Sequence, residues 1–155
     1  MSWLASGGDR SFTMGVLPQV AACFDALYDS LWTQPHLPAD ILELCRLRLA
    51  QLHRSDVEWE RTGVDVAASK RDALRHWDSD PLFSAAERAC LAFTEVYAMD
   101  AQAITDALAQ GVKELFGDAG LVLLVEALGI LDGMTRLSLL WQLPAGAHAQ
   151  VSGRS

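Results

Sequence analysis

The residue types best suited to chemistry lie between positions 43 and 58. Glu43 and Glu58 could form a carboxylate pair in a largely apolar pocket, where one stays protonated as an acid and the other acts as a base. Alternatively, Ser55 and Glu58 are spaced as in a capping box, which only starts a helix: each side chain accepts a hydrogen bond from the other residue's amide. The residue types leave both interpretations open.

His53 adds a third alternative, a nucleophile pair with Ser55, although no acid or oxyanion feature accompanies it. The four histidines, at positions 36, 53, 76 and 148, are scattered and lack metal-ligand spacing. The sequence therefore predicts neither a metal site nor a bound cofactor. We expect the three widely spaced cysteines to be reduced thiols of the core: Cys23, Cys45 and Cys90.

Helices must position these residues, because apolar side chains recur at steps of three and four along most of the chain. We expect helices over residues 14–33, from about 40 to 53, from 55 to about 70, around 71–77, from 84 onward, over 101–115 and from about 118 to 143. Asp40 and Glu43 give the second an acidic start. Ser84 and Glu87 form a capping box, and Gly117 ends the helix over 101–115.

No run alternates between apolar and polar residues as a strand would. The expected fold is therefore an all-α bundle of about six to seven helices in a single domain. We expect that domain to cover residues 13–143, between an N-terminal tail over 1–12 and a flexible C-terminal tail over 144–155.

Composition excludes several classes of function. With 155 residues, 51% of them hydrophobic, the chain can bury one core without disulfides or metal. A net charge of −8 argues against nucleic acid as a partner. The longest apolar run, residues 121–131, is too short for a membrane span and contains Glu126. The first ten residues do not resemble a signal peptide, so we expect a cytoplasmic protein.

Two helices contain unusual surfaces. The last expected helix is apolar on nearly every side, which is more than one chain of this size can cover, and this predicts a homo-oligomer. Asp132 and Arg136 are spaced to pair on it. Arg48 falls on the apolar face of the helix over 40–53, so we expect it to reach solvent or to pair with an acid.

Three stretches together resemble the alkylhydroperoxidase D-like and carboxymuconolactone decarboxylase superfamily, over roughly residues 38–142. They are Glu43-Leu-x-x-Leu-Arg-Leu-Ala-Gln51, then Trp77-Asp-Ser-x-x-x-Phe-Ser-x-x-Glu-Arg-Ala-x-Leu-Ala-Phe93, and the apolar last helix with Arg136 near its end. The resemblance implies that family's helical fold. It also implies a peroxidase of the peroxiredoxin type or a decarboxylase.

The resemblance also implies where the site lies. In the peroxidase branch a glutamate is followed after twelve residues by Cys-x-x-Cys, with a histidine four residues later; these positions fall here on Glu43, Ser55, Glu58 and Thr62. Only the glutamate matches, and a serine or a glutamate cannot form the disulfide of that chemistry. The decarboxylase branch uses acid and base residues instead. Val57-Glu58-Trp59 is similar to a Glu-Trp variant of the superfamily, with Thr62 at the place of its histidine.

Two hypotheses about function follow. The first is a pseudoenzyme: an oligomeric binding or regulatory protein that has lost the redox Cys-x-x-Cys, with itself and a small organic ligand as partners. The alternative is a cofactor-free acid/base enzyme, of decarboxylase or isomerase type, that acts on a small organic acid or lactone through Glu43 and Glu58. The sequence leaves open whether the protein is an enzyme.

Overall fold

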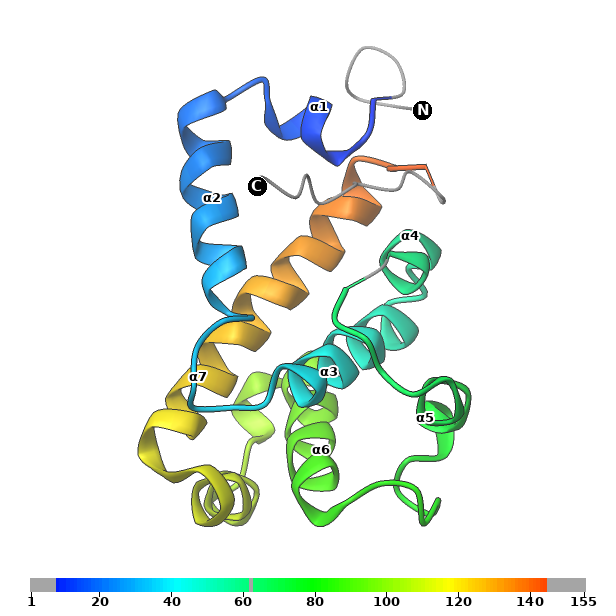
Figure 1. Ribbon diagram of the computed structural model, residues 1–155, viewed down its shortest axis with the longest axis vertical. Coiled ribbons are helices and arrows are strands. Elements are labelled where there is room, and N and C mark those ends of the chain that lie inside the picture. The colour runs from blue at the N-terminus through cyan, green and yellow to red at the C-terminus, as the bar shows by residue number, and fades with distance from the viewer. Residues whose placement is uncertain (1–7, 62, 145–155) are drawn as a thin grey trace.

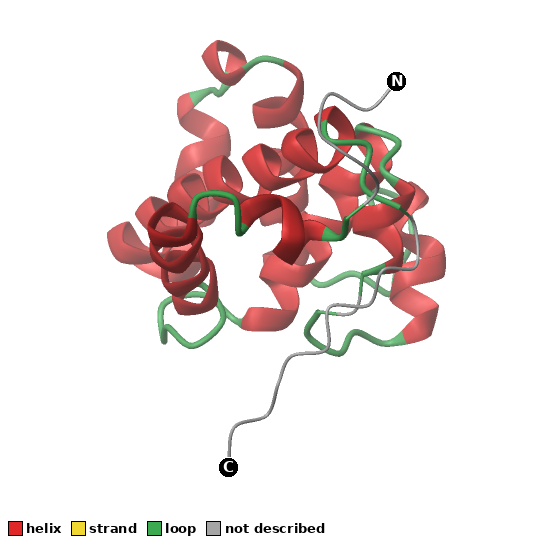
Figure 2. Ribbon diagram, turned by 90° about the horizontal axis from the view of Figure 1, so that it is seen from above, coloured by secondary structure: helices red, strands yellow, loops and turns green. Residues whose placement is uncertain are grey.

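The computed structural model describes residues 8–61 and 63–144, and its regular elements in these ranges are all helical (Figures 1 and 2). The helices are α1 (Arg10–Met14), α2 (Pro18–Ser30), α3 (Ala39–Leu52), α4 (Asp56–Glu60), α5 (Ala68–Ala73), α6 (Ala85–Met99) and α7 (Asp106–Leu140). Two short 3-10 helices follow α5 and α6: η1 (Leu74–His76) and η2 (Ala101–Ala103). The predicted all-α bundle is confirmed.

Helix α3 lies at the centre of the molecule, packed against α4, α6 and α7 (Figure 1). Every residue from 41 to 47 is buried. One core cluster joins α3 to α2, α6 and α7, and a smaller one joins it to η1 and the start of α6. Because α3 is covered on all sides from residue 41 to 47, a charged side chain in that stretch must find its partners inside the protein.

The helix expected over 14–33 begins at Pro18 instead. Proline has no amide hydrogen and disfavours a helical residue before it, and Leu17 has the non-helical angles φ −122° and ψ 79°. Pro18 is therefore the first residue of α2, and α1 is a separate short helix capped by Asp9.

The helix expected from 55 to about 70 is interrupted after Glu60. Arg61 is extended, with ψ 126°, and residues 63–67 are not helical. Glycine and the β-branched residues Val64 and Val66 lower the helix propensity of this segment. Side chains from other helices then bind the carbonyl groups that the interruption leaves free, as described below for Arg46.

Local signals further along the chain predict the structure well. Ser84 and Glu87 form the expected capping box, with nitrogen–oxygen distances of 3.2 and 2.8 Å. Gly117 interrupts α7 with φ 69° and ψ −175°, so that two helical segments meet there. The left-handed φ suits glycine, which has no Cβ to clash.

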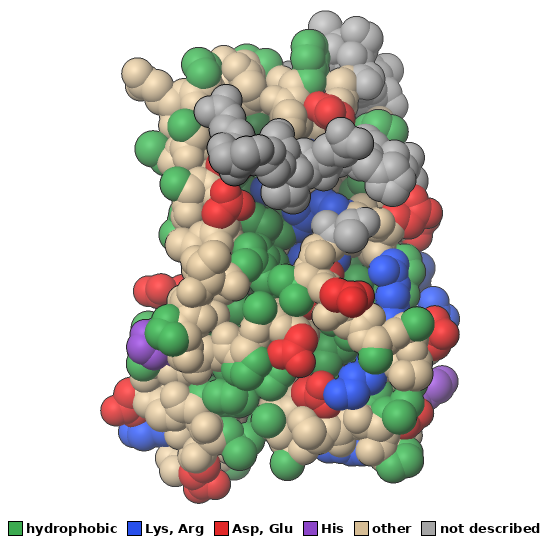
Figure 3. All heavy atoms as spheres, viewed as in Figure 1, with side chains coloured by type: hydrophobic (Ala, Val, Ile, Leu, Met, Phe, Trp, Pro, Cys, Tyr) green, Lys and Arg blue, Asp and Glu red, His purple; other side chains and the backbone are tan. Residues whose placement is uncertain are grey.

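The outer surfaces of α2 and α7 remain partly apolar in the single chain, and Figure 3 shows hydrophobic side chains along α2. The expectation of a core thiol is wrong for Cys23, which is exposed on α2, because no other described element covers that side of the helix. Within residues 8–61 and 63–144, no helix combines the length and the apolar character needed to cross a bilayer.

Candidate functional site

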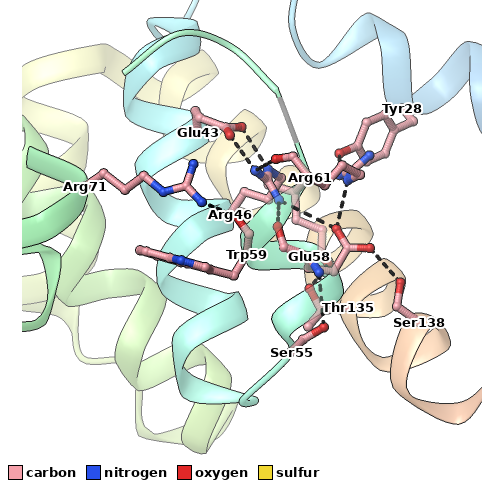
Figure 4. A network of polar contacts seen from close by, with 11 residues as sticks. Tyr28, Glu43, Arg46, Ser55, Glu58, Trp59, Arg61, Arg71, Thr135 and Ser138 are labelled. Carbon is pink, nitrogen blue, oxygen red and sulfur yellow. Dashed lines mark hydrogen bonds and ion pairs between the residues drawn. The ribbon is translucent and has the colours of Figure 1, made fainter. Parts of the chain in front are cut away.

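Arg46 is the centre of a buried polar network, with a side chain only 1% exposed (Figure 4). Its Nε and Nη2 donate to the two carboxylate oxygens of Glu43 at 2.9 and 2.5 Å. Nη1 donates to the carbonyl of Glu58 at 2.5 Å, and Nη2 also donates to that of Arg61 at 3.0 Å. Burial by itself lowers the pKa of Arg46, but the hydrogen bonds and charge of Glu43 outweigh it and raise the pKa. The guanidinium is therefore a permanent buried cation.

The carboxylate of Glu58 is buried and bound on both oxygens. Oε1 accepts from the hydroxyl of Ser138 on α7 at 2.6 Å, and Oε2 accepts from Nε of Arg61 at 3.0 Å. Nη1 of Arg46 lies 3.6 Å from Oε2. Glu58 thereby links α4 to α3 and α7. We call these five residues the Arg46 network: Glu43, Arg46, Glu58, Arg61 and Ser138.

Only half of the expected capping box forms at Ser55. Its hydroxyl accepts from the amide of Glu58 at 3.4 Å and caps α4. The amide of Ser55, however, donates to the carbonyl of Ala50 at 2.9 Å instead of to Glu58. The physical reason is electrostatic: a carboxylate is stabilised more by buried arginines and a hydroxyl donor than by one neutral amide.

The structure brings Glu43 and Glu58 together as expected, but with Arg46 between them. The two carboxylates and the cations of Arg46 and Arg61 cancel in formal charge. The surroundings are thus polar and compensated, in contrast to the largely apolar pocket expected for an acid–base pair. The last position matched by the resemblance, Thr62, lies outside the described residues.

Gly63 lies against the Glu43 carboxylate. A Cβ at this position would come within 2.5 Å of Glu43 Oε2 and 2.7 Å of Oε1. The absence of a side chain lets the backbone after α4 approach the Glu43–Arg46 pair closely. In the sequence, the glycine at position 63 is therefore the one sign that the backbone comes close to the Glu43 side chain here.

Aromatic and basic groups from the N-terminal helices border the network. The guanidinium groups of Arg10 and Arg61 lie 4.8 and 5.0 Å from the centroid of the Tyr28 ring. The Tyr28 hydroxyl also accepts a hydrogen bond from Arg61. Burial lowers the pKa of Arg10, and the nearby positive charge of Arg61 lowers it further. Among the described residues, the cavity lined by Arg10, Arg61 and Glu58 has a volume of about 20 Å³.

His53 faces away from Ser55. Its Nε2 lies 2.5 Å from Oδ1 of Asp132 on α7, so the alternative of a Ser–His pair does not match the geometry. Asp132 also accepts from Nε of Arg136 at 2.7 Å, which confirms the predicted pair of these two residues. The contact of His53 with Asp132 therefore links the C-terminal end of α3 to α7.

Neither buried thiol is activated. Burial raises the pKa of Cys45 to about 12, and it also raises the pKa of Cys90. A protonated, buried thiol is neither a nucleophile nor a good metal ligand. Over the described part of the chain, no three His, Cys, Asp or Glu side chains gather closely enough to hold a metal ion.

Sequence reasoning missed the roles of Arg46, Arg61 and Ser138. It noted Arg48, which pairs with Glu95 at 2.6 Å, in agreement with the expected structural pair. The available signal for Arg46 was its position three residues after Glu43 inside an apolar run, where a charged pair has to be buried together. Ser138 gave no signal, because it lies 80 residues from Glu58 in the chain.

No family model and no curated protein matches this sequence. Several solved structures, however, are similar to this chain in fold. An AhpD-like protein of unknown function from Agrobacterium tumefaciens is 16% identical with a TM-score of 0.76, over 88% of this chain and 99% of that one. A variant of the debrominase Bmp8 in complex with 2,3,4-tribromopyrrole is 17% identical with a TM-score of 0.75, over 87% of this chain and 75% of that one. Ligand-free Bmp8 gives the same values.

The chain therefore has the alkylhydroperoxidase D-like fold, as its sequence resemblance implied. Identities of 16 and 17% establish the fold alone. Fold alone does not carry chemistry from one protein to another. What this chain does has to be inferred from its own side chains.

Proposed function

We propose that this protein is a binding protein on the alkylhydroperoxidase D-like fold, without thiol redox chemistry. The observation that carries the proposal is the state of Glu58, which stands where the resemblance places the second thiol. Both of its carboxylate oxygens are held by hydrogen bonds, from Ser138 and Arg61, and Arg46 balances its charge. A carboxylate held in this way connects helices and is not free to turn towards a substrate.

The acid/base alternative requires Glu43 or Glu58 to exchange a proton with a ligand. Both carboxylates are instead occupied by contacts within the protein: Glu43 binds Arg46, and Glu58 binds Arg61 and Ser138. The 20 Å³ cavity beside Glu58 has room for a single water rather than an organic acid. These features argue against catalysis by Glu43 or Glu58.

A peroxidase assay tests the absence of redox chemistry. We expect no consumption of tert-butyl hydroperoxide with dithiothreitol above the rate in buffer alone, because Cys45 and Cys90 are buried and protonated. Thiol-dependent turnover that disappears in Cys23→Ser or Cys45→Ala would overturn the proposal.

Glu58→Gln separates binding from acid/base catalysis if a substrate screen finds any activity. We expect the variant to keep that activity within a few-fold of wild type, since the carboxylate serves to hold helices. A hundredfold loss in Glu58→Gln, with Ser138→Ala retaining activity at matched stability, would instead favour proton transfer by Glu58.

We also infer that the protein assembles with copies of itself. Val122 and Val125 on α7 are 56 and 43% exposed, and Val16 and Val20 beside and on α2 are 67 and 60% exposed. Apolar surfaces of this extent on a soluble chain are typical of interfaces. Light scattering at micromolar concentration should give a mass above that of one chain, and a monomer would contradict the inference.

A small organic ligand is the third part of the proposal. Bmp8, whose structure has the same fold, was crystallised with 2,3,4-tribromopyrrole, so this helical scaffold can accommodate a small ring compound.

A further inference from the structure

A larger cavity lies on the other side of α4 from Glu58. It has a volume of about 410 Å³ and opens between the end of α3, α4 and the α5–η1 segment. Figure 3 shows basic side chains at the surface between α4 and α5. We call this cavity the arginine pocket, after three of the residues that line it: Arg54, Arg71 and Arg75. Its volume falls in the range of small-molecule sites.

The charge of the arginine pocket is opposite to that of the whole chain. Its three arginines are accompanied by two acids, Asp56 and Asp72, which leaves a formal charge of +1 in a protein of net charge −8. No ion pair among the described residues includes Arg54 or Arg75. Their guanidinium groups are therefore available to an anion.

Arg71 is held in place before any ligand binds. Its guanidinium lies over the ring of Trp59, 4.6 Å from the centroid, and Nη2 donates to the Trp59 carbonyl at 2.5 Å (Figure 4). A guanidinium has five N–H donors, so further donors remain for a ligand. Because Arg71 is already ordered, binding loses less side-chain entropy.

Arg54 has a backbone conformation that favours glycine. Its φ is 55°, and it directly follows the C-terminal end of α3, which closes in a Schellman motif. In this motif the amide of Arg54 donates to the Gln51 carbonyl at 3.2 Å, and the amide of Ser55 donates to the Ala50 carbonyl at 2.9 Å. Glycine would adopt this conformation without strain, yet the sequence has a long cationic side chain at the rim of the pocket. A role for the side chain accounts for an arginine here.

We propose that the arginine pocket binds a small planar organic monoanion of the aromatic carboxylate class. The net charge of +1 matches one negative charge better than two, and the guanidinium fork matches a carboxylate in a two-bond geometry. Trp59 and Ala50 supply the apolar part of the wall for a ring. The proposal deepens the proposed binding function by naming a ligand class and the residues that hold it.

Calorimetry and NMR test the proposal with 2-naphthoate as the probe. The matched uncharged compound is 2-naphthamide, and phenyl phosphate serves as a dianion. We expect 2-naphthoate to bind at least tenfold more tightly than either compound and to shift the indole N–H signal of Trp59, assigned with Trp59→Phe. The affinity should fall severalfold as the salt concentration is raised.

Two variants separate binding from folding. Arg54→Gly removes the side chain where glycine is the preferred residue, and Arg75→Gln changes an exposed side chain, so neither should lower the melting temperature. We expect each to weaken 2-naphthoate binding tenfold or more. Lys113→Gln removes one positive charge on α7, from a pair with Asp118, and should leave the affinity unchanged.

Three results would overturn the proposal: no binding of 2-naphthoate, equal affinity for the carboxylate and the amide, or unchanged affinity in both arginine variants. Tighter binding of phenyl phosphate would overturn the choice of a monoanion. Failure here is distinguishable from failure of the proposed function, because thiol-dependent turnover in the peroxidase assay would leave these binding data unaffected.

Discussion

Arginines lie on both sides of α4, but in opposite states. Towards α7, Arg46 and Arg61 are buried or half-buried, and each faces a carboxylate, with Glu58 shared between them. Towards α5, Arg54 and Arg75 are exposed and border an open cavity. Both sides are made by one five-residue helix, whose alternate faces carry Glu58 and Trp59.

This difference separates structural from functional charge. A buried guanidinium must be paired, because an isolated charge in the interior is costly, so the Arg46 network holds α3, α4 and α7 together. An exposed guanidinium remains hydrated at little cost and keeps its donors for a ligand. The resemblance pointed to the buried side, whereas Arg54 and Arg75, which take part in no ion pair of the described residues, lie on the open side.

The largest effect should come from Arg46→Met. Without the guanidinium, Glu43 and Glu58 lose their shared cation and two carbonyls lose their donor, so we expect a loss of about 3–5 kcal/mol in the free energy of unfolding. Urea unfolding followed by circular dichroism measures it. The control Arg48→Met, on the same helix but partly exposed, should lose only about 1 kcal/mol. Equal losses in the two variants would contradict a special role for Arg46.

Ser138→Ala should have the next largest effect. It removes the buried hydroxyl that donates to Glu58 at 2.6 Å, and hydrogen bonds to charged groups contribute about 2 kcal/mol. The same unfolding experiment on Ser79→Ala, whose hydroxyl makes only exposed local bonds, should change stability by less than about 0.5 kcal/mol. A Ser138→Ala protein as stable as Ser79→Ala would show that Glu58 does not depend on α7.

Gly63→Ala tests how closely the backbone packs against the Glu43 carboxylate on the buried side of α4. The new methyl group would push on a carboxylate that Arg46 holds in place, so we expect a loss of about 1.5 kcal/mol. In Gly111→Ala the methyl meets no atom within 4 Å, and the helix should gain about 0.5–1 kcal/mol. Thermal unfolding of both variants measures this difference in sign, and two stabilising substitutions would contradict the close packing at Gly63.

The smallest effect concerns a wall of the arginine pocket and depends on pH. Glu87 on α6 holds α5 through Lys70 at 2.5 Å. Burial raises the pKa of Glu87, but the hydrogen bonds from Lys70 and Ser84 outweigh it, so the pKa lies below its ordinary value of 4.5. The unfolded chain therefore binds the proton more readily, and the stabilisation is complete above that value and lost as pH falls through the folded pKa.

We accordingly expect the stability advantage of the wild type over Glu87→Gln to shrink between about pH 6 and about pH 3, as urea unfolding at each pH would measure. A difference in the free energy of unfolding that stays constant over this range would mean that the charge of Glu87 does not contribute to stability.

Several features could be predicted from the sequence because their physics is local. The helical periodicity, the capping box of Ser84 and Glu87, the break at Gly117 and the pair of Asp132 and Arg136 each involve residues within about four positions of each other. That Glu43 and Glu58 belong to one site was implied by the resemblance, whose motif positions fall on these two residues. Such signals depend on few neighbours and are therefore readable from one chain.

Only the tertiary structure decided which charges are buried. Arg46 and Arg48 stand two residues apart on α3, and the sequence favoured Arg48 as the unusual one. Packing of α4 and the segment after it against Arg46 brings the carbonyls of residues 58 and 61 to its guanidinium, while Arg48 reaches Glu95 nearer the surface. The tertiary structure also decided that Cys23 on α2 is exposed, although its apolar neighbours in the sequence indicated a core thiol. Burial of a charge depends on segments far away in the chain, such as Ser138 at 80 residues from Glu58, and local spacing contains no information about them.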